Sequence, residues 1–502
     1  MLVSALLALE AGCGSDALPP AGTLVVAIES EPQSLDPRFG LDAASSRVAD
    51  LVHAGLTRAD ANARRVGDLA DTWEYRGPTT LVFRLSPTAR FSDGTPVTAA
   101  DVRATYEAIR DPALGSPKRA ALEPLVRIET PASDVVVMQL TEPTPSFLDE
   151  TGLAIVPAAQ ARGPERPLGA GPFRIVETKV AEHVVLEPSQ AFHRGVPDIA
   201  RLVFRVVPDP VVRVLLLDRG HVHFLQESLE PELLRWLGAR PGLRVHRRPG
   251  SSVAYLGLNL RHPQLAARRV RRAIALALDR DELVRTVLGG LARPATGLLS
   301  PEHWAYVRQT PRAPNPARAR RLLDRAGLPD PDGPGPRPRL RLLYKASSQP
   351  SRRRLAEAIQ AQLAQVGIAL DIRTYEWATL FADVRKGNFQ VVAMTWVGIT
   401  DPDLYYRVFH SSMIPPTGYN RGYYRDAVMD RLTIRARRTV DFERRRRLYI
   451  RIQRRLEHEL PIVPLWWEDR VVVHSNRLVG FTPVPSGDLR GLAVARLEAP
   501  SP

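Results

Sequence analysis

The chain is nearly free of cysteine, and it has no long apolar segment. Its 502 residues include one cysteine, Cys13, which excludes an intrachain disulfide and a cysteine-ligated metal site. No apolar run reaches the roughly 18 residues that indicate a membrane-spanning helix. The sequence therefore predicts neither a disulfide framework nor a transmembrane segment.

Lysine is also scarce, although the net charge is +15. Of 69 basic residues only Lys118, Lys179, Lys345 and Lys386 are lysines. Such an arginine excess is typical of coding bias in a GC-rich genome. The arginines are scattered apart from 352–354 and 444–447, which we interpret as solvated helix faces. Without an accompanying recognition motif, we predict no nucleic-acid partner.

Motifs of catalysis are missing. His458-Glu459 lacks the second histidine of a zinc-protease helix, residues 169–174 lack the third glycine of a dinucleotide loop, and residues 250–254 do not form G-x-S-x-G. His221 and His223 could point to one side of a strand and share a metal, but we favour an exposed strand edge over a metal pair. We therefore expect no catalytic residue, no cofactor and no metal site.

Length and periodicity indicate a large mixed α/β protein of several domains. Hydrophobic residues make up 44% and charged residues 25% of the chain, as in ordinary globular proteins. Apolar residues spaced by four predict one helix over 266–289, and residues 339–374 alternate strand, helix and strand. The polar, proline-rich residues 161–167 are a candidate boundary.

Residues 81–102, LVFRLSPTARFSDGTPVTAADV, are the most informative segment. They predict a strand, a turn at Asp93-Gly94 and a helix capped by Thr98 and Asp101. The order FSDGTPVTAADV resembles the family 5 extracellular solute-binding proteins, the peptide- and nickel-type receptors of ABC importers. Other segments resemble that family in its own order: residues 31–37 (EPQSLDP), 167–173 (PLGAGPF), 192–195 (FHRG), 256–259 (LGLN), 269–280 (RVRRAIALALDR), 396–403 (WVGITDPD), 418–420 (GYN) and 460–466 (LPIVPLW).

The resemblance implies an α/β periplasmic-binding-protein fold with two lobes, mixed sheets and a third, inserted domain. It divides the chain as follows: lobe I from residues 23–50, 165–250 and 472–497, an inserted domain over 51–164, and lobe II over 251–471. Residues 1–22 would form a signal and tether. Small residues before Cys13 are typical of a lipoprotein signal, although a plain secretory leader remains an alternative. We expect a periplasmic or other extracytoplasmic location, with the membrane reached through a lipid on Cys13.

The resemblance also indicates a ligand site between the lobes. Trp396 would supply a flat apolar wall, and Gly398 would allow close approach to the backbone. In peptide-binding members an acid stands where this chain has Gly398, and it pairs with the peptide amine. Asp401 and Asn420 would contact the ligand or shape their loops. Three further residues are expected at the cleft: Tyr419 in lobe II, and Ser34 and Arg38 in lobe I.

The expected function is capture of a small solute by hinge closure, followed by delivery to the membrane subunits of an ABC permease. The ligand would be a peptide or a peptide-like molecule, and the receptor would be a monomer. A chelated-metal receptor is the alternative within this class. A ligand sensor on the same fold, or a hydrolase built on it, are alternatives outside the class.

Overall fold

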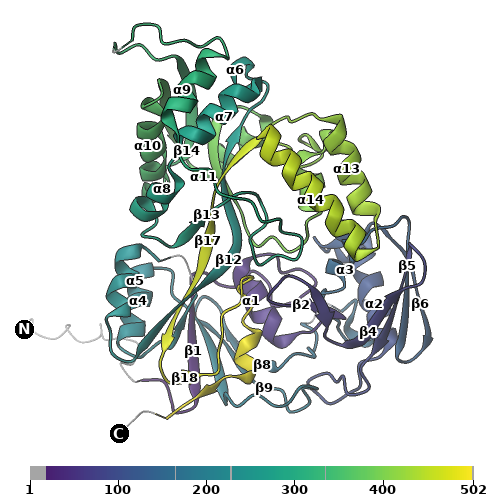
Figure 1. Cartoon of the computed structure of the whole chain (residues 1–502). Helices are drawn as coiled ribbons and strands as arrows, with labels where there is room; N and C mark the ends of the chain where they lie inside the picture. Colours follow the sequence, from purple (N-terminus) through teal and green to yellow (C-terminus); the bar gives the residue numbers. More distant parts are fainter. Residues whose placement is uncertain (1–17, 164–165, 227–228, 334, 500–502) are drawn as a thin grey trace, which may run out of the picture.

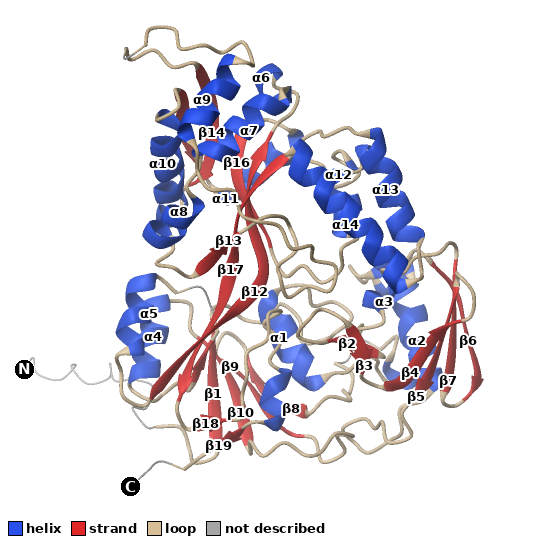
Figure 2. Ribbon diagram, viewed as in Figure 1, coloured by secondary structure: helices blue, strands red, loops and turns tan. Residues whose placement is uncertain are grey.

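The computed structural model describes residues 18–163, 166–226, 229–333 and 335–499. Its main feature is a mixed eleven-stranded sheet that runs through most of the molecule (Figures 1 and 2). The strand order is β15-β14-β16-β12-β17-β11-β1-β10-β9-β8, with β13 paired to β17. The strands are β1 (Thr23–Ile28), β8 (Phe173–Lys179), β9 (His183–Pro188), β10 (Arg201–Val206), β11 (Phe224–Leu225), β12 (Leu243–Leu258), β13 (Ala292–Pro294), β14 (Leu340–Ser347), β15 (Ile368–Tyr375), β16 (Val391–Trp396) and β17 (Ile462–Ser475).

Two long antiparallel strands, β12 and β17, join the upper and lower halves of the molecule (Figure 1). Their register shifts between Pro249 and Val253, where the strands pass from one half to the other. A β-bulge of this kind bends the strand and increases its twist. A Cβ at Gly250 would lie 2.4 Å from the Glu468 carbonyl oxygen, so only glycine fits at this bulge.

The lower half, which we call lobe I, packs helices on the β1–β10–β9–β8 part of the sheet. Leu24, Phe173 and Val472 share its buried core although they lie far apart in the chain. The element bounds are α1 (Ala43–Val52), α4 (Pro210–Asp218), α5 (Pro231–Gly238), β18 (Leu478–Val479) and β19 (Arg496–Leu497).

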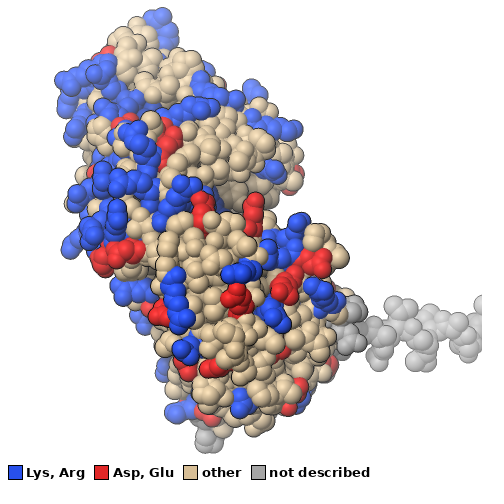
Figure 3. Space-filling view, turned by 90° about the vertical axis from the view of Figure 1, so that its right-hand side faces the viewer, with Lys and Arg blue, Asp and Glu red and all other residues tan. Residues whose placement is uncertain are grey.

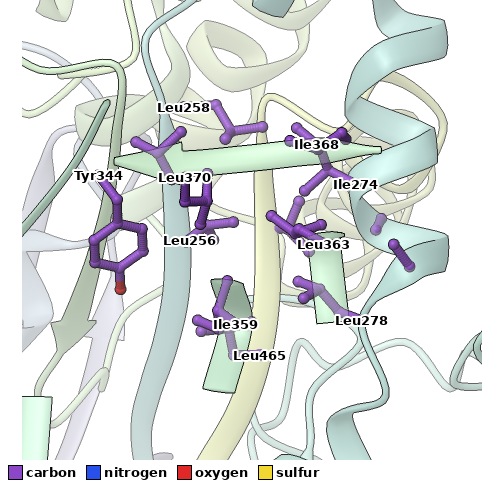
Figure 4. Packing of buried hydrophobic residues seen from close by; sticks show 14 of the residues in the cluster. Leu256, Leu258, Ile274, Leu278, Tyr344, Ile359, Leu363, Ile368, Leu370 and Leu465 are labelled. Carbon is purple, nitrogen blue, oxygen red and sulfur yellow. The ribbon is translucent and has the colours of Figure 1, made fainter. Parts of the chain in front are cut away.

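The upper half, lobe II, has its own core around Leu256, Ile274 and Leu370 (Figure 4). Helices cover β14, β15 and β16, which gives the parallel α/β alternation expected for this part of the chain. The helices are α6 (Pro263–Ala266), α7 (Arg268–Ala277), α8 (Arg280–Val287), α9 (Pro316–Asp324), α10 (Pro350–Ala364), α11 (Trp377–Lys386), α12 (Leu404–Phe409), α13 (Ala427–Arg438) and α14 (Phe442–Glu459).

A smaller body, the inserted domain, lies beside lobe I. A four-stranded antiparallel sheet packs on α2 around a separate core that includes Phe83, Val102 and Tyr106. Its elements are β2 (Thr57–Ala59), β3 (Arg65–Gly67), β4 (Ala70–Tyr75), β5 (Thr80–Leu85), α2 (Ala99–Arg110), β6 (Leu125–Ala132), β7 (Val135–Leu140) and α3 (Phe147–Glu150). The expected turn and capped helix are present: Gly94 has φ +90°, and the Thr98 N–H donates to Asp101 at 2.8 Å.

Lobe I and the inserted domain are held together by hydrogen bonds to backbone carbonyls. The Ser92 N–H donates to the Gly169 carbonyl at 2.9 Å, and the Ser116 hydroxyl donates to the Arg38 carbonyl at 2.6 Å. The Lys118 ammonium donates to the Pro37 carbonyl at 2.6 Å. These contacts oppose sliding of one body over the other, so we treat the two as one unit. The domain boundaries drawn from the sequence stay a prediction.

The single helix predicted over residues 266–289 is wrong, because the chain forms α7 and α8 with a break between them. Leu278 has extended backbone angles, and the Asp279 carboxylate then accepts from the Glu282 N–H at 2.9 Å. Asp279 is thus the N-cap of a second helix, and the apolar spacing continues across the break. Within the described residues no helix is both long and apolar enough to cross a bilayer.

The bulge at Gly250 gives a stability prediction. Gly250→Ala places a methyl group against backbone rather than a movable side chain, so we expect a loss of about 1–3 kcal/mol in unfolding free energy. Thermal and urea unfolding would measure it. Gly297→Ala is the control, because a Cβ there meets nothing within 4 Å and should cost less than about 0.5 kcal/mol. Equal stability of the two variants would show that the bulge relaxes freely.

Candidate functional site

A cavity of about 520 Å³ opens between lobe I with its inserted domain and the start of lobe II. This volume is in the range of small-molecule sites, roughly 300–1,000 Å³. Lobe II contributes Val397, and Arg470 of β17 reaches the cavity at the crossing between the halves. The other residues that bear ionisable or polar side chains are Ser34, Asp36, Ser45, Ser46, Arg47, Asp50, His53, Thr57, Arg58, Arg65, Lys118, Asp149, Glu150, Gln226, Ser486, Asp488 and Arg490.

The loop after β1 supplies one wall, and it contains the predicted residues Ser34 and Arg38. Ser34 lines the cavity, and its hydroxyl accepts from the Asp36 N–H at 3.1 Å. Arg38 is 1% exposed and forms an ion pair with Asp36 at 2.6 Å. Its guanidinium also donates to the carbonyls of Gln160 at 3.0 Å and Ala161 at 2.6 Å. Arg38 therefore ties lobe I to the inserted domain and positions Asp36 at the cavity wall.

A network of carboxylates surrounds Arg490 at the base of the cavity. The guanidinium lies 3.6 Å from Asp50, 3.7 Å from Asp488 and 3.9 Å from Asp68. Burial raises the pKa of Asp50 to about 6 even though the Arg490 charge acts against the shift. Arg490 thus lies among three carboxylates, of which Asp68 is also paired with Arg194 at 3.3 Å.

Helix α3 of the inserted domain places Asp149 and Glu150 at another part of the wall. Burial and then the charge of Asp401 raise the pKa of Asp149 to about 7, although Arg65 lies 3.9 Å away. Burial also raises the pKa of Glu150. Both carboxyl groups are therefore poorly neutralised by the protein.

The lobe II loop that follows β16 places its predicted residues in two environments. Trp396 stacks on Tyr255 with ring centroids 6.1 Å apart, contacts Tyr419 at 5.6 Å, and lies under the Arg421 guanidinium at 5.0 Å. Val397 instead points into the cavity and is 76% exposed. Gly398 adopts φ +62°, which turns the chain after Val397.

Asp401 is held by the protein. Its carboxylate accepts two hydrogen bonds from Arg445 at 2.9 and 3.0 Å and one from the Asp403 N–H at 2.6 Å. Arg445 is buried, so the prediction of a solvated face for the whole run 444–447 is wrong at this residue. An unpaired buried carboxylate or guanidinium is costly, and each of these groups therefore stabilises the other.

Asn420 ties two loop segments together. It is 1% exposed, its amide donates to the carbonyls of His410 at 3.1 Å and Tyr424 at 2.7 Å, and its oxygen accepts from the Tyr424 N–H at 2.9 Å. The structure thus favours the loop-shaping interpretation for Asn420 and Asp401. The structure places Ser34 at the cavity and Trp396 beside Tyr419. Contact of these three residues with a ligand stays a prediction.

Two other predictions from the sequence concern the pair His221 and His223 and the lone Cys13. His223 accepts a hydrogen bond from the Val25 N–H at 3.0 Å, and burial lowers its pKa to about 4. In the described part of the chain no group of three potential metal ligands is present. Cys13 lies outside the described residues.

Most residues that line the cavity were not found from the sequence. Arg47 and Asp50 lie on α1, whose sequence pattern is that of an ordinary amphipathic helix. Asp149 and Glu150 lie on α3, a helix of one turn. No local signal distinguishes these acids from surface acids, because tertiary packing alone brings them to one cavity.

The role of Asn420 gives a prediction that separates it from its neighbour. Asn420→Ala leaves two carbonyls and one N–H without their partner, so we expect a loss of about 1–3 kcal/mol in stability. Tyr419→Ala removes a half-exposed ring and should cost less than half as much. Thermal unfolding of both variants measures the difference. The loop-tying role would be contradicted if Asn420→Ala melted at the wild-type temperature.

The raised pKa of Asp149 predicts a pH-dependent stability. Because the folded-state pKa of about 7 exceeds the unfolded value near 3.9, folding favours the protonated carboxyl. This stability is present below pH about 4 and is lost as pH rises through about 7. We therefore expect Asp149→Asn to raise the melting temperature at pH 8 and to have a clearly smaller advantage at pH 5. A constant difference between the variant and the wild type at both pH values would contradict the shift.

Comparison with known proteins identifies the family. Residues 64–413 match the family model of bacterial extracellular solute-binding proteins, family 5. The chain is 28% identical to a Pseudomonas aeruginosa protein named Probable di/tripeptide-binding protein 5, with 95% of this chain and 96% of that protein covered. It is 26% identical to the oligopeptide-binding protein AppA of Bacillus subtilis, with 93% of this chain and 90% of that protein covered.

Solved structures share the fold. The ABC transporter substrate-binding protein CtaP of Listeria monocytogenes superposes with a TM-score of 0.85 at 22% identity, covering 95% of this chain and 99% of that one. AppA of Bacillus subtilis, solved with a nonapeptide, gives 0.74 at 24% identity and covers 95% and 99%. The predicted α/β periplasmic-binding-protein fold is confirmed. With the family model matching residues 64–413, the chain belongs to the family 5 bacterial extracellular solute-binding proteins.

Proposed function

We propose that this protein is the extracytoplasmic receptor of an ABC importer and that it captures a peptide or a peptide-like solute. The observation that carries the proposal is the charged 520 Å³ cavity between two bodies that β12 and β17 join as a continuous sheet. Membership of a solute-binding family and the peptide-binding names of its relatives support it. The protein binds its solute without chemical change.

Capture proceeds by rotation of lobe II about the β12–β17 crossing. Hinge closure around a ligand is a known transition of periplasmic binding proteins, and it needs a ligand that binds the closed state more tightly than the open state. Val397 already projects from lobe II into the cavity. Closure would press this apolar side chain against the solute and expel water from around the charged wall.

A peptide suits the chemistry of this wall. Its backbone carries donors and acceptors that do not depend on sequence, and its two termini carry opposite charges. The wall offers arginines, carboxyl groups and hydroxyls from Ser34, Ser46 and Thr57. Binding through termini and backbone tolerates different side chains, as an importer of mixed peptides requires.

Attachment to the membrane would be through a lipid on Cys13. The lone cysteine after a run of small residues and the Pro-Pro-Ala-Gly segment that follows support this assignment. The described N-terminal strand β1 lies in lobe I, so a tether would hold the lower half of Figure 1 nearer the membrane. Such a receptor acts as a monomer that docks on its permease after closure.

A ligand screen tests the proposal. We expect mixtures of di- to pentapeptides at millimolar concentration to raise the melting temperature of the purified protein by several degrees. The physical reason is that a ligand present at 100 times its Kd stabilises a protein by about 2.7 kcal/mol. Small-angle scattering should show a smaller radius of gyration with peptide. Stabilisation by a nickel chelate alone, or turnover of the peptides, would contradict the proposal.

A further inference from the structure

The charges that line the cavity are not evenly distributed. Two arginines from different elements, Arg47 of α1 and Arg470 of β17, lie at the side formed by the strand crossing. Two carboxyl groups, Asp149 and Glu150, lie on the side formed by α3 of the inserted domain. The two pairs differ in which groups of the protein compensate their charges.

Arg470 has no acidic partner at the basic side. Among the described residues it makes one hydrogen bond, to the Ser486 carbonyl at 3.3 Å, and no carboxylate lies within 4.0 Å of it; the Glu468 carboxylate acts on its charge from farther away. Burial and then the like charge of Arg47 lower the pKa of Arg470, so the two cations repel each other. Arg47 is paired with Glu29 at 2.8 Å and donates to the Gln226 carbonyl at 3.2 Å. Among the described residues Arg470 thus lacks a carboxylate in direct contact, and Glu468 compensates its charge only from a distance.

Gly487 makes room for Arg470 at this position. A Cβ at Gly487 would lie 2.9 Å from the Arg470 Cζ, so the guanidinium rests directly on the backbone. Gln226 fixes this loop, because its amide donates to the Gly487 carbonyl at 2.6 Å. The guanidinium is therefore held in place before any ligand arrives.

The acidic side is equally incomplete. Arg65 lies 3.9 Å from the Asp149 carboxylate. Its guanidinium donates instead to Thr57, to the carbonyl at 2.8 Å and to the hydroxyl at 2.7 Å. Glu150 has no basic nitrogen within 4.0 Å in the part of the chain that the structure describes. The nearby charges of Arg407, Arg65 and Lys118 act on Glu150 from farther away. Neither of the two adjacent carboxyl groups thus forms a close ion pair among the described residues, although several cations act on them from farther away.

Resting on the proposed function, we infer that the cavity takes a zwitterionic solute in one orientation. The solute's carboxylate would bind at Arg470 and Arg47, and its ammonium group would bind at Asp149 and Glu150. The cationic end would then be held by the inserted domain, and not by lobe II, where Gly398 offers no acid. Each end of the solute supplies the charge that its side of the cavity lacks.

The test uses tripeptide mixtures in three forms: with free termini, N-acetylated, and C-amidated. Thermal-shift titration of the full-length protein gives an apparent affinity for each form. We expect the free form to bind about ten- to a hundredfold more tightly than either blocked form, which is the range for a hydrogen bond to a charged group. Equal binding of all three forms would overturn the orientation and leave peptide capture intact. No shift with any form would overturn the proposed function as well.

Variants then assign each end. Asp149→Asn with Glu150→Gln should remove the preference for a free amine and keep the preference for a free carboxylate, and Arg470→Gln should do the reverse. Arg248→Gln is the matched control for the basic side, since Arg248 pairs with Arg470 across the sheet but is exposed outside the cavity. The exposed Glu123→Gln is the control for the acidic side.

Folding is checked by the melting temperature of each variant without ligand. If Arg470→Gln does not fold, Arg470→Lys keeps the charge and should keep the preference for a free carboxylate at reduced strength, because lysine lacks the bidentate fork. Any folded variant that retains the preference assigned to the group it has lost would overturn the inference.

Discussion

The antiparallel pair of β12 and β17 is the constraint on which the rest of the structure depends. It carries a backbone ladder from one half of the molecule to the other, so the two halves cannot separate or slide. The ladder is interrupted between Pro249 and Val253, where a bulge allows bending. Asp469 lies beside this point and is paired with Arg247 and, at 3.6 Å, with Arg293, which keeps charges at the hinge compensated. The bulge is therefore the point at which the strand pair bends.

This hinge explains why charge can remain incompletely neutralised in the cavity. Lobe I and the inserted domain are joined by the hydrogen bonds of Arg38 and Lys118, so their facing charges are fixed in position. A fixed site with unpaired charges costs stability when it is empty, as the raised pKa of Asp149 shows. A solute that supplies the missing charges recovers that cost. Water exclusion on closure makes the recovered interactions stronger, because the local dielectric falls.

Sequence reasoning succeeded where local physics decides the structure. The segment 81–102 fixes its own turn and cap, and the family motifs predicted the fold that the comparisons confirm. It failed over residues 266–289, where the regular apolar spacing predicted one helix. Asp279 caps a second helix there, and the spacing does not reveal this break. It failed again at Arg445, whose partner Asp401 lies 44 positions away. The cavity wall combines α1, α3 and the β17 crossing, and no periodicity links such distant segments.

The arginine excess has a different meaning inside the cavity and outside it. On the face shown in Figure 3, Lys and Arg side chains are spread over the surface and are most numerous over its upper half. Exposed charges of this kind contribute little to stability and are screened by salt. In the cavity, by contrast, Arg470 is largely shielded from water, and it has no carboxylate within 4.0 Å among the described residues. Selectivity would then come from the fixed wall of lobe I and the inserted domain, while lobe II provides, through Val397, an apolar cover that favours closure without choosing between charges.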